Sequence, residues 1–122
     1  TPINLLENIA LGVDMFDCVM PTRNARTGTL FTWNGIMNIK NKKWEHDFSP
    51  LDPAGSADVD QMYSKSYVRH LIRANEILAM YITSIHNLAF YLDLVKEARL
   101  HILAGDFVEW KDKMVKQVSQ KM

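Results

Sequence analysis

The side chains that could take part in a reaction lie mainly in one stretch, residues 14–28, "DMFDCVMPTRNARTG". Asp17 carries a carboxylate, which can attack an electron-poor carbon and form a covalent intermediate. The Cys18 thiol is a nucleophile only when it is ionised. Arg23 and Arg26 carry planar guanidinium groups that grip phosphates or stack on unpaired bases. The pattern indicates group transfer beside a phosphate-bearing ligand; the structural alternatives are a turn cap for Asp17 and solvated surface for the arginines.

A strand is expected to carry the first of these groups. Residues 13–19, "VDMFDCV", are too short and too apolar for anything but a strand buried on both faces. Side chains alternate along a strand, so Asp14 faces away from Asp17 and is predicted to be a structural hydrogen-bond partner. Cys18 also points away from Asp17 and is predicted to be a small buried filler. A capped helix over residues 2–11 precedes the strand, which is typical of an alternating α/β fold.

Local patterns predict the remaining elements. A proline-, asparagine- and glycine-containing loop follows the strand, and the Asn34-Gly35 dipeptide predicts a two-stranded hairpin with a type I′ turn. Prolines and a glycine without any apolar period predict an irregular loop, and apolar residues every three to four positions predict helices. The loops are expected at residues 21–28 and 42–60, and the helices at residues 61–81, from a cap at Ser84 to Gly105, and from an Asp106/Glu109 capping box onward.

Composition limits the classes of protein. The 122 residues hold 14 Lys and Arg against 14 Asp and Glu, so no overall field attracts nucleic acid or an anionic membrane. The single cysteine excludes an internal disulfide and a thiolate zinc site. No apolar run is expected to approach the roughly 20 residues that a membrane helix needs. We therefore expect a cytoplasmic protein that does not meet a membrane.

Three stretches carry a family resemblance: "DMFDCVMPTRNARTG", then "LFTWNGIMNIKN", then "HNLAFY". In this order they resemble the C-terminal part of bacterial tRNA-guanine transglycosylases, the queuine tRNA-ribosyltransferases. The resemblance implies an α/β fold, the C-terminal part of a (β/α)₈ TIM-type barrel with an inserted β-hairpin and a helical C-terminal subdomain. The isolated chain is expected to be mostly helical.

The same resemblance implies three regions. Residues 1–28 would form a late barrel helix, the catalytic strand and an RNA-binding loop. Residues 29–60 would form the β-hairpin and an irregular loop that replaces a zinc subdomain. Residues 61–122 would form the helical C-terminal region. In such barrels reactive side chains sit at the C-terminal ends of strands, which is where Asp17 is expected.

The implied activity is that of a pentosyltransferase in queuosine biosynthesis. Asp17 would attack the ribose C1′ of the wobble guanosine of tRNA, form a covalent RNA intermediate, and be displaced by a 7-deazaguanine base. Arg23 and Arg26 would hold the anticodon loop beside the flipped-out nucleotide. The base-recognition residues and a second catalytic residue would lie upstream, so this chain alone is expected to be inactive. A non-catalytic RNA-binding or assembly subunit of the same family is the alternative, which the retained Asp17 disfavours.

The resemblance also concerns metal binding. Relatives carry a zinc subdomain with three cysteines and one histidine, and the matching positions here are Gly55, Ala57, Asp60 and His86. Two of these side chains cannot bind a metal, so neither zinc nor another cofactor is expected. His86 is then expected to form a hydrogen bond near its helix start or to pack under the long loop.

A homodimer is implied for the whole enzyme. The positions that match the family's dimer contact are Tyr63, Tyr67, His70 and Ile82. Aromatic residues at helical spacing also occur in ordinary cores, and that alternative stays open.

Overall fold

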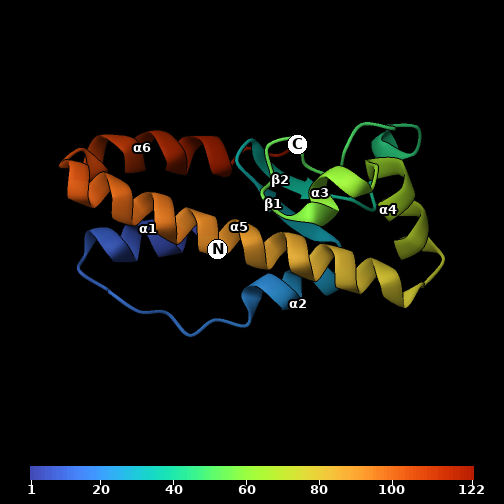
Figure 1. Ribbon diagram of the computed structural model, residues 1–122, viewed down its shortest axis with the longest axis horizontal. Helices are drawn as coiled ribbons and strands as arrows, with labels where there is room; N and C mark the ends of the chain where they lie inside the picture. Colours follow the sequence, from blue (N-terminus) through green and yellow to red (C-terminus); the bar gives the residue numbers. More distant parts are fainter.

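The computed structural model describes residues 1–122 and is mostly helical, as expected from the sequence. One long helix, α5, runs along the molecule, and the other α-helices and β1 pack on it (Figure 1). The elements in chain order are α1 (Pro2–Ala10), α2 (Met20–Arg26), β1 (Thr29–Thr32), β2 (Gly35–Asn38), the 3₁₀ turn η1 (Lys42–Trp44), α3 (Asp58–Met62), α4 (Lys65–Arg73), α5 (Ile77–Ala104) and α6 (Phe107–Val118).

The prediction of helix α1 is confirmed. The Thr1 hydroxyl accepts a hydrogen bond from the Asn4 N–H at 3.3 Å, and Pro2 occupies the first turn, where its missing N–H costs nothing. Gly12 follows the helix with a φ of +99°, a conformation that glycine adopts without strain. The chain therefore leaves α1 in a sharp turn.

The strand predicted over residues 13–19 is wrong, because this segment has no regular structure. A strand buried on both faces needs neighbouring strands and covering layers, and the chain supplies neither at this place. The loop predicted over residues 21–28 is also wrong in part, because Met20–Arg26 forms α2. Pro21 lies in its first turn, where proline favours a helix.

The predicted hairpin is confirmed, but its turn differs. Thr32 pairs with Gly35, so Trp33 and Asn34 form the turn, and only Gly35 has a positive φ, of 133°. The Thr32 hydroxyl accepts from the Asn34 N–H at 3.1 Å and donates to the Gly35 carbonyl at 2.9 Å. The Thr32 side chain therefore bridges the turn. The predicted type I′ turn is wrong, because it needs a positive φ at both turn residues and neither Trp33 nor Asn34 has one.

The helices after the hairpin break at a different residue from the one predicted. The helix predicted over residues 61–81 is interrupted, and Ser84 lies inside α5 and caps nothing. One break falls at Tyr63 and Ser64, between α3 and α4, and the other at Asn75, the one residue other than glycine with a positive φ, of 57°. Asparagine tolerates this left-handed conformation and often ends a helix, so this signal was present in the sequence.

The last helix begins as predicted but without the predicted capping box. The Asp106 carboxylate accepts a hydrogen bond from His101 Nδ1 at 2.8 Å, and the Asp106 side chain makes no cap bond to α6. The His101 ring stacks on Trp110, with ring centroids 4.7 Å apart. The turn between α5 and α6, in which Gly105 has a φ of +79°, is fixed by these contacts.

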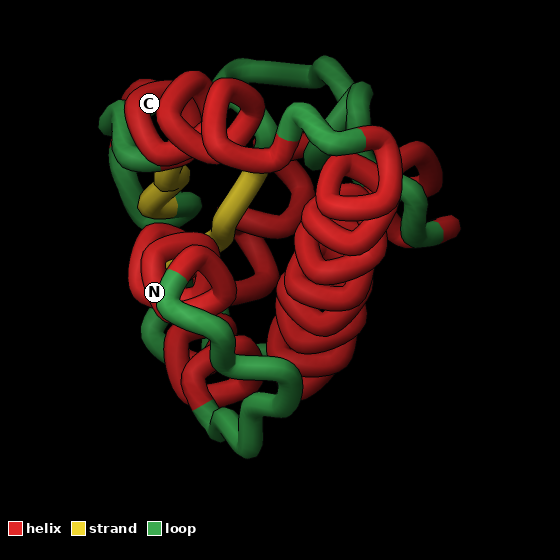
Figure 2. Tube along the Cα trace, turned by 90° about the vertical axis from the view of Figure 1, so that its left-hand side faces the viewer, coloured by secondary structure: helices red, strands yellow, loops and turns green.

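Helix α5 has 28 residues and corrects the expectation that no apolar segment reaches membrane-spanning length. By length and composition alone it could cross a membrane, although 44% of its most apolar window is buried inside the molecule. Its inner side meets the hairpin, and the strands lie between helices (Figure 2). A buried core helix can have the same length and apolar composition, so these two properties do not distinguish a core helix from a membrane-spanning one.

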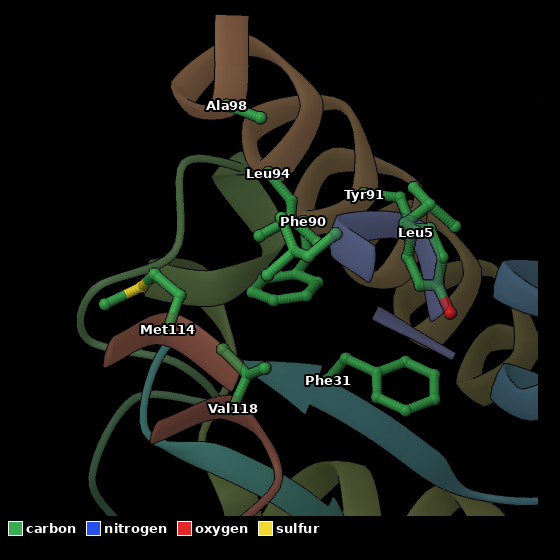
Figure 3. Close-up of a cluster of buried hydrophobic side chains, with 9 residues drawn as sticks. Leu5, Phe31, Phe90, Tyr91, Leu94, Ala98, Met114 and Val118 are labelled. Carbon is green, nitrogen blue, oxygen red and sulfur yellow. The ribbon is translucent and has the colours of Figure 1, made fainter. Parts of the chain in front are cut away.

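The core has two parts along α5. The first cluster joins α1, β1, α5 and α6, and Phe31, Phe90 and Leu94 meet Met114 and Val118 within it (Figure 3). The second cluster lies around β2, η1 and α4 and is built on Leu30, Met37, Ile39, Trp44, Leu51, Val68, Leu71, Ala79 and Ile82. Together the two clusters fix the hairpin against the middle of α5.

Candidate functional site

The predicted nucleophile, Asp17, lies on the irregular segment between α1 and α2 and is exposed to solvent. Its carboxylate makes no hydrogen bond or ion pair with another residue of the chain. Asp14 is exposed as well, and so is Cys18, which corrects its prediction as a buried filler. Phe16 is the half-buried side chain of this segment and packs against the first core cluster. The carboxylate is thus accessible but is not oriented by a neighbouring group.

Arg23 and Arg26 lie on the last turn of α2. Residues three apart on a helix share one side, so the two guanidinium groups project in similar directions. Both residues are exposed, and neither forms an ion pair within the chain. Two unpaired cations on one side of α2 make this helix a place where an anionic ligand can bind.

Helix α2 is held in place by polar side chains of α5. The Asn87 amide nitrogen donates to the carbonyls of Pro21 and Thr29, each at 3.0 Å, and its oxygen accepts from the Phe31 N–H at 3.1 Å. Asn87 is fully buried, so these bonds are shielded from water. One side chain therefore sets the arginine-bearing helix relative to the hairpin. Sequence reasoning missed this role, although the polar His-Asn pair on an apolar helix was the signal.

His86 is the second buried polar anchor. Its Nε2 lies 2.8 Å from the Phe31 carbonyl, which can only accept, so Nε2 carries a proton. Its Nδ1 lies 2.5 Å from Asp60 Oδ1, and a second proton must lie between these two atoms. Both side chains are 1% exposed. His86 and Asn87 thus bind both polar groups of Phe31, on the edge of β1 that has no neighbouring strand.

The four positions compared with a zinc site lie together. The Asp60 carboxylate accepts from the Ala57 N–H at 3.1 Å and contacts His86 through its other oxygen. A Cβ at Gly55 would lie 2.0 Å from Asp60 Oδ2, so a side chain at position 55 would displace this carboxylate. No group of three His, Cys, Asp or Glu side chains is arranged to hold a metal ion. The two potential ligands bind each other, and the residues present do not fit a zinc ion.

Asp52 is a buried carboxyl next to this pair. Its Oδ1 accepts from the Ala54 N–H at 3.1 Å, but its Oδ2 has no hydrogen-bond partner. Burial raises the pKa of Asp52 above the ordinary 3.8, while His86 and the Ala54 N–H lower it in part and Asp60 raises it further. Folding therefore makes Asp52 harder to ionise than it is in the unfolded chain.

The structure does not bring the four residues of the predicted dimer contact to one surface. Tyr63 and Tyr67 stack with their ring centroids 5.7 Å apart, and Tyr67 and His70 are exposed on α4. Exposed Phe48 lies beside Tyr67 in the same surface hollow. Ile82 lies in the second core cluster with 1% exposure and does not reach this surface.

The fold is mostly helical and carries two exposed arginines on α2 and an exposed carboxylate, Asp17, on the segment before it. Comparison with known proteins then gives the family: the family model "Queuine tRNA-ribosyltransferase" matches residues 1–120. The queuine tRNA-ribosyltransferase of Nitratidesulfovibrio vulgaris is 53% identical over 111 residues, which are 91% of this chain and 30% of that protein. The chain belongs to the queuine tRNA-ribosyltransferase family.

Two further relatives agree over almost the whole chain. The queuine tRNA-ribosyltransferase of Aquifex aeolicus is 49% identical over 121 residues, and that of Helicobacter pylori is 46% identical over 121 residues. Each match covers 99% of this chain but only 32% and 33% of the relative. The chain thus spans about a third of the length of these curated relatives and corresponds to their C-terminal part.

Proposed function

We propose that this chain is the C-terminal portion of a tRNA-guanine transglycosylase, which exchanges the wobble guanine of tRNA for a 7-deazaguanine in queuosine biosynthesis. The observation that carries the proposal is the match of residues 1–120 to the family, with relatives 46–53% identical. The enzyme is a pentosyltransferase, and its partners are the anticodon loop of tRNA and the incoming base.

Asp17 is the proposed nucleophile. When guanine leaves, the ribose C1′ acquires positive character, and the carboxylate captures it in a covalent RNA intermediate. The 7-deazaguanine then attacks the same carbon and releases Asp17. Its accessibility and its lack of any partner within the chain support this role, because a carboxylate held in an ion pair is a weaker nucleophile.

Arg23 and Arg26 are the proposed tRNA contacts. They follow Asp17 closely in the chain, and Asn87 fixes the start of their helix on α5. Guanidinium groups bind phosphates bidentately and stack on unpaired bases, which suits an anticodon loop from which one nucleotide is flipped out. We expect Arg23→Lys to weaken tRNA binding more than a surface Arg99→Lys change, because lysine keeps the charge but loses the planar fork.

In the complete enzyme, residues 13–19 are proposed to be a strand of a (β/α)₈ barrel, with Asp17 at its catalytic end. The chain alone is proposed to be inactive, because Asp17 lies on an irregular segment and nothing in the chain orients it. The buried Asp60–His86 pair is proposed to take the structural place of the zinc ion found in relatives. Localisation in the cytoplasm follows from the same assignment.

A homodimer is proposed for the complete enzyme. Exposed Tyr67, whose ring stacks on half-buried Tyr63, shares a hollow with exposed Phe48 and His70 and supports it, since exposed aromatic groups are common at interfaces. Sedimentation of the complete enzyme should show a dimer, and Tyr67→Glu should yield monomers. A dimer that persists in this variant would exclude this surface.

The experiment that tests the function measures incorporation of labelled guanine into tRNA by the polypeptide of full family length. Asp17→Asn should lower the rate by about 10³-fold or more and abolish the covalent adduct on a denaturing gel. Asp14→Asn, on the same segment, is the matched control and should keep the adduct. An unchanged rate in Asp17→Asn would remove Asp17 from the mechanism. No incorporation by the unsubstituted polypeptide would favour the alternative, a non-catalytic RNA-binding or assembly subunit.

A further inference from the structure

One stretch of the chain after Asp17 is purely basic. Residues 18–44 hold five lysines and arginines and no aspartate or glutamate, although the whole chain carries 14 cations and 14 carboxylates. Two of the five are the arginines of α2, and the other three follow the hairpin. These three are Lys40, Lys42 and Lys43. A chain without net charge thus concentrates positive charge in one place.

The three lysines lie on residues 38–44, the lysine turn, whose backbone is fixed by two asparagine side chains. Asn38 Oδ1 accepts a hydrogen bond from the Lys40 N–H at 3.1 Å. Asn41 Oδ1 accepts one from the Lys43 N–H, also at 3.1 Å. In the sequence "NIKNKKW" an asparagine therefore stands two residues before each of these two lysines and sets the course of its backbone.

Neighbouring side chains hold the lysine turn against the rest of the molecule. The indole N–H of buried Trp44 donates to the Asn38 carbonyl at 3.0 Å. Arg69 of α4 donates through Nε to the Asn41 carbonyl at 3.1 Å, and its side chain is only 13% exposed. A surface that is built before its ligand arrives loses little conformational entropy on binding.

The charges of the lysine turn are available to a ligand. Lys40, Lys42 and Lys43 are all exposed, and none of them forms an ion pair within the chain. The Lys43 ammonium lies 4.6 Å from the centroid of the Trp44 ring, so a cation–π contact holds it beside the turn. Three unpaired like charges on one short turn repel one another, and an anionic ligand would relieve that repulsion.

Lys40 connects the lysine turn with the end of α2. A Cβ at Gly28 would lie 3.1 Å from Lys40 Cγ and 3.2 Å from its Cε, so the lysine stem lies across the backbone just after the helix. The Ile39 N–H donates to the Gly28 carbonyl at 3.0 Å. Arg26 and Lys40 line one hollow, and Glu76 in the same hollow pairs with neither. The positive surface is therefore continuous from α2 to the lysine turn.

The two kinds of cation suit different parts of an RNA hairpin. A guanidinium group is planar and stacks on unpaired bases, as a loop presents them, whereas an ammonium group is a compact point charge on a flexible stem. In a paired RNA stem the narrow major groove hides the bases from side chains, and contacts are made to phosphate and ribose. Arginines beside lysines thus match a loop beside a stem.

We infer that the lysine turn binds the phosphates of the anticodon stem, while Arg23 and Arg26 hold the loop. The inference rests on the proposed function for the identity of the RNA and adds a second contact surface to it. Contacts to phosphate fix the register and orientation of a nucleic acid without reading its bases. The lysine turn therefore contributes affinity and orientation, and the choice of nucleotide is left to the loop.

The test measures tRNA affinity at several salt concentrations in the polypeptide of full family length. Every protein carries Asp17→Asn, which keeps the covalent step out of the binding measurement. The test variant is Lys40→Met/Lys42→Met/Lys43→Met, in which methionine keeps an unbranched side chain and removes the charge. The control removes the same charge from exposed lysines of α5 and α6 and is Lys96→Met/Lys113→Met/Lys116→Met.

Loss of three phosphate contacts should change the salt dependence as well as the affinity. In the test variant the slope of log Kd against log salt concentration should fall by about 2 to 3, and tRNA should bind at least about 10-fold more weakly near physiological salt. The control should keep the slope within about 0.5. Arginine at all three positions of the turn should also keep it, because the charges remain.

An RNA hairpin with uncharged methylphosphonates in its stem identifies the part of the RNA that is bound. It should bind the Asp17→Asn protein as weakly as normal RNA binds the test variant, and the two changes together should weaken binding no further. A test variant that matches the control, or full additivity of the two changes, would overturn the inference.

Base exchange, measured without Asp17→Asn, separates this inference from the proposed function. Incorporation of guanine together with a test variant that matches the control refutes the lysine turn alone. Absence of incorporation together with lysine-dependent binding of the stem refutes the proposed reaction alone. Failure of the Asp17→Asn protein to bind tRNA would overturn both.

Discussion

Removing one partner of the buried Asp60–His86 pair should destabilise the fold strongly. Both side chains are 1% exposed, their contact is 2.5 Å, and His86 also binds the Phe31 carbonyl. His86→Ala leaves the Asp60 carboxylate buried with the Ala57 N–H as its one donor. Breaking such a pair costs about 3–5 kcal/mol, a large share of the roughly 5–15 kcal/mol that stabilises a domain.

Urea unfolding followed by circular dichroism and tryptophan fluorescence measures the loss in the free energy of unfolding. Thermal unfolding followed by the same signals gives the change in midpoint. At about 4 °C per kcal/mol for a chain of this size, the thermal midpoint of His86→Ala should fall by roughly 12–20 °C. Asp58→Asn is the control, because this carboxylate lies on the same short helix and is exposed. It should change the free energy of unfolding by less than about 0.5 kcal/mol.

The double variant Asp60→Asn/His86→Ala separates the pair from its surroundings. If the two groups act as a unit, its destabilisation should be smaller than the sum of the single values by at least about 1 kcal/mol. Single variants within about 1 kcal/mol of the unsubstituted chain, or strictly additive values, would refute the view that this pair anchors α3 to α5.

Four further outcomes follow from the same region. Gly55→Ala should lose about 1–3 kcal/mol, because its Cβ forces Asp60 away; equal stability in an unfolding titration would contradict the 2.0 Å contact. Asp52 has a raised folded pKa, so stability should fall as the pH rises from about 4 through that value; Asp52→Asn should lose this slope in midpoints measured against pH. Asn87→Ala should cost about 3 kcal/mol for three lost buried bonds, with faster hydrogen exchange at Phe31 as the check and normal protection as the refuting result. Plasma emission spectrometry should find no stoichiometric zinc, and one zinc ion per chain would overturn the proposed metal-free anchor.

Local signals predicted those elements whose causes lie within a few residues. Helix α1 follows from its cap and its first-turn proline, and the hairpin follows from a turn sequence between two β-prone runs. The helix break was missed because the apolar period continues through Asn75, although asparagine is the residue that tolerates its left-handed backbone. The strand over residues 13–19 was predicted from composition alone, and a buried strand depends on neighbours that are distant in sequence.

The polar anchors show the other limit of sequence reasoning. His86 was predicted to form a hydrogen bond near its helix start or to pack under the long loop, and it does bind Asp60 of that region. Its second bond, to Phe31, spans 55 residues, and the Asn87 bond to Pro21 spans 66. No local pattern encodes pairings of this separation. The family resemblance pointed to Asp60 and His86, but that they bind each other and anchor Phe31 is visible only in the folded chain.

The same two side chains explain why the hairpin is stable although the segment that carries Asp17 has no regular secondary structure. An edge strand normally needs another strand beside it, but His86 and Asn87 satisfy both polar groups of Phe31 from α5, so the hairpin is stable without that neighbour. Asn87 extends this order to Pro21 and thereby to the arginine-bearing helix. No equivalent side chain reaches Asp17. The stability of the hairpin and the orientation of the proposed nucleophile therefore have separate sources: His86 and Asn87 of α5 serve the first, and no side chain of this chain serves the second.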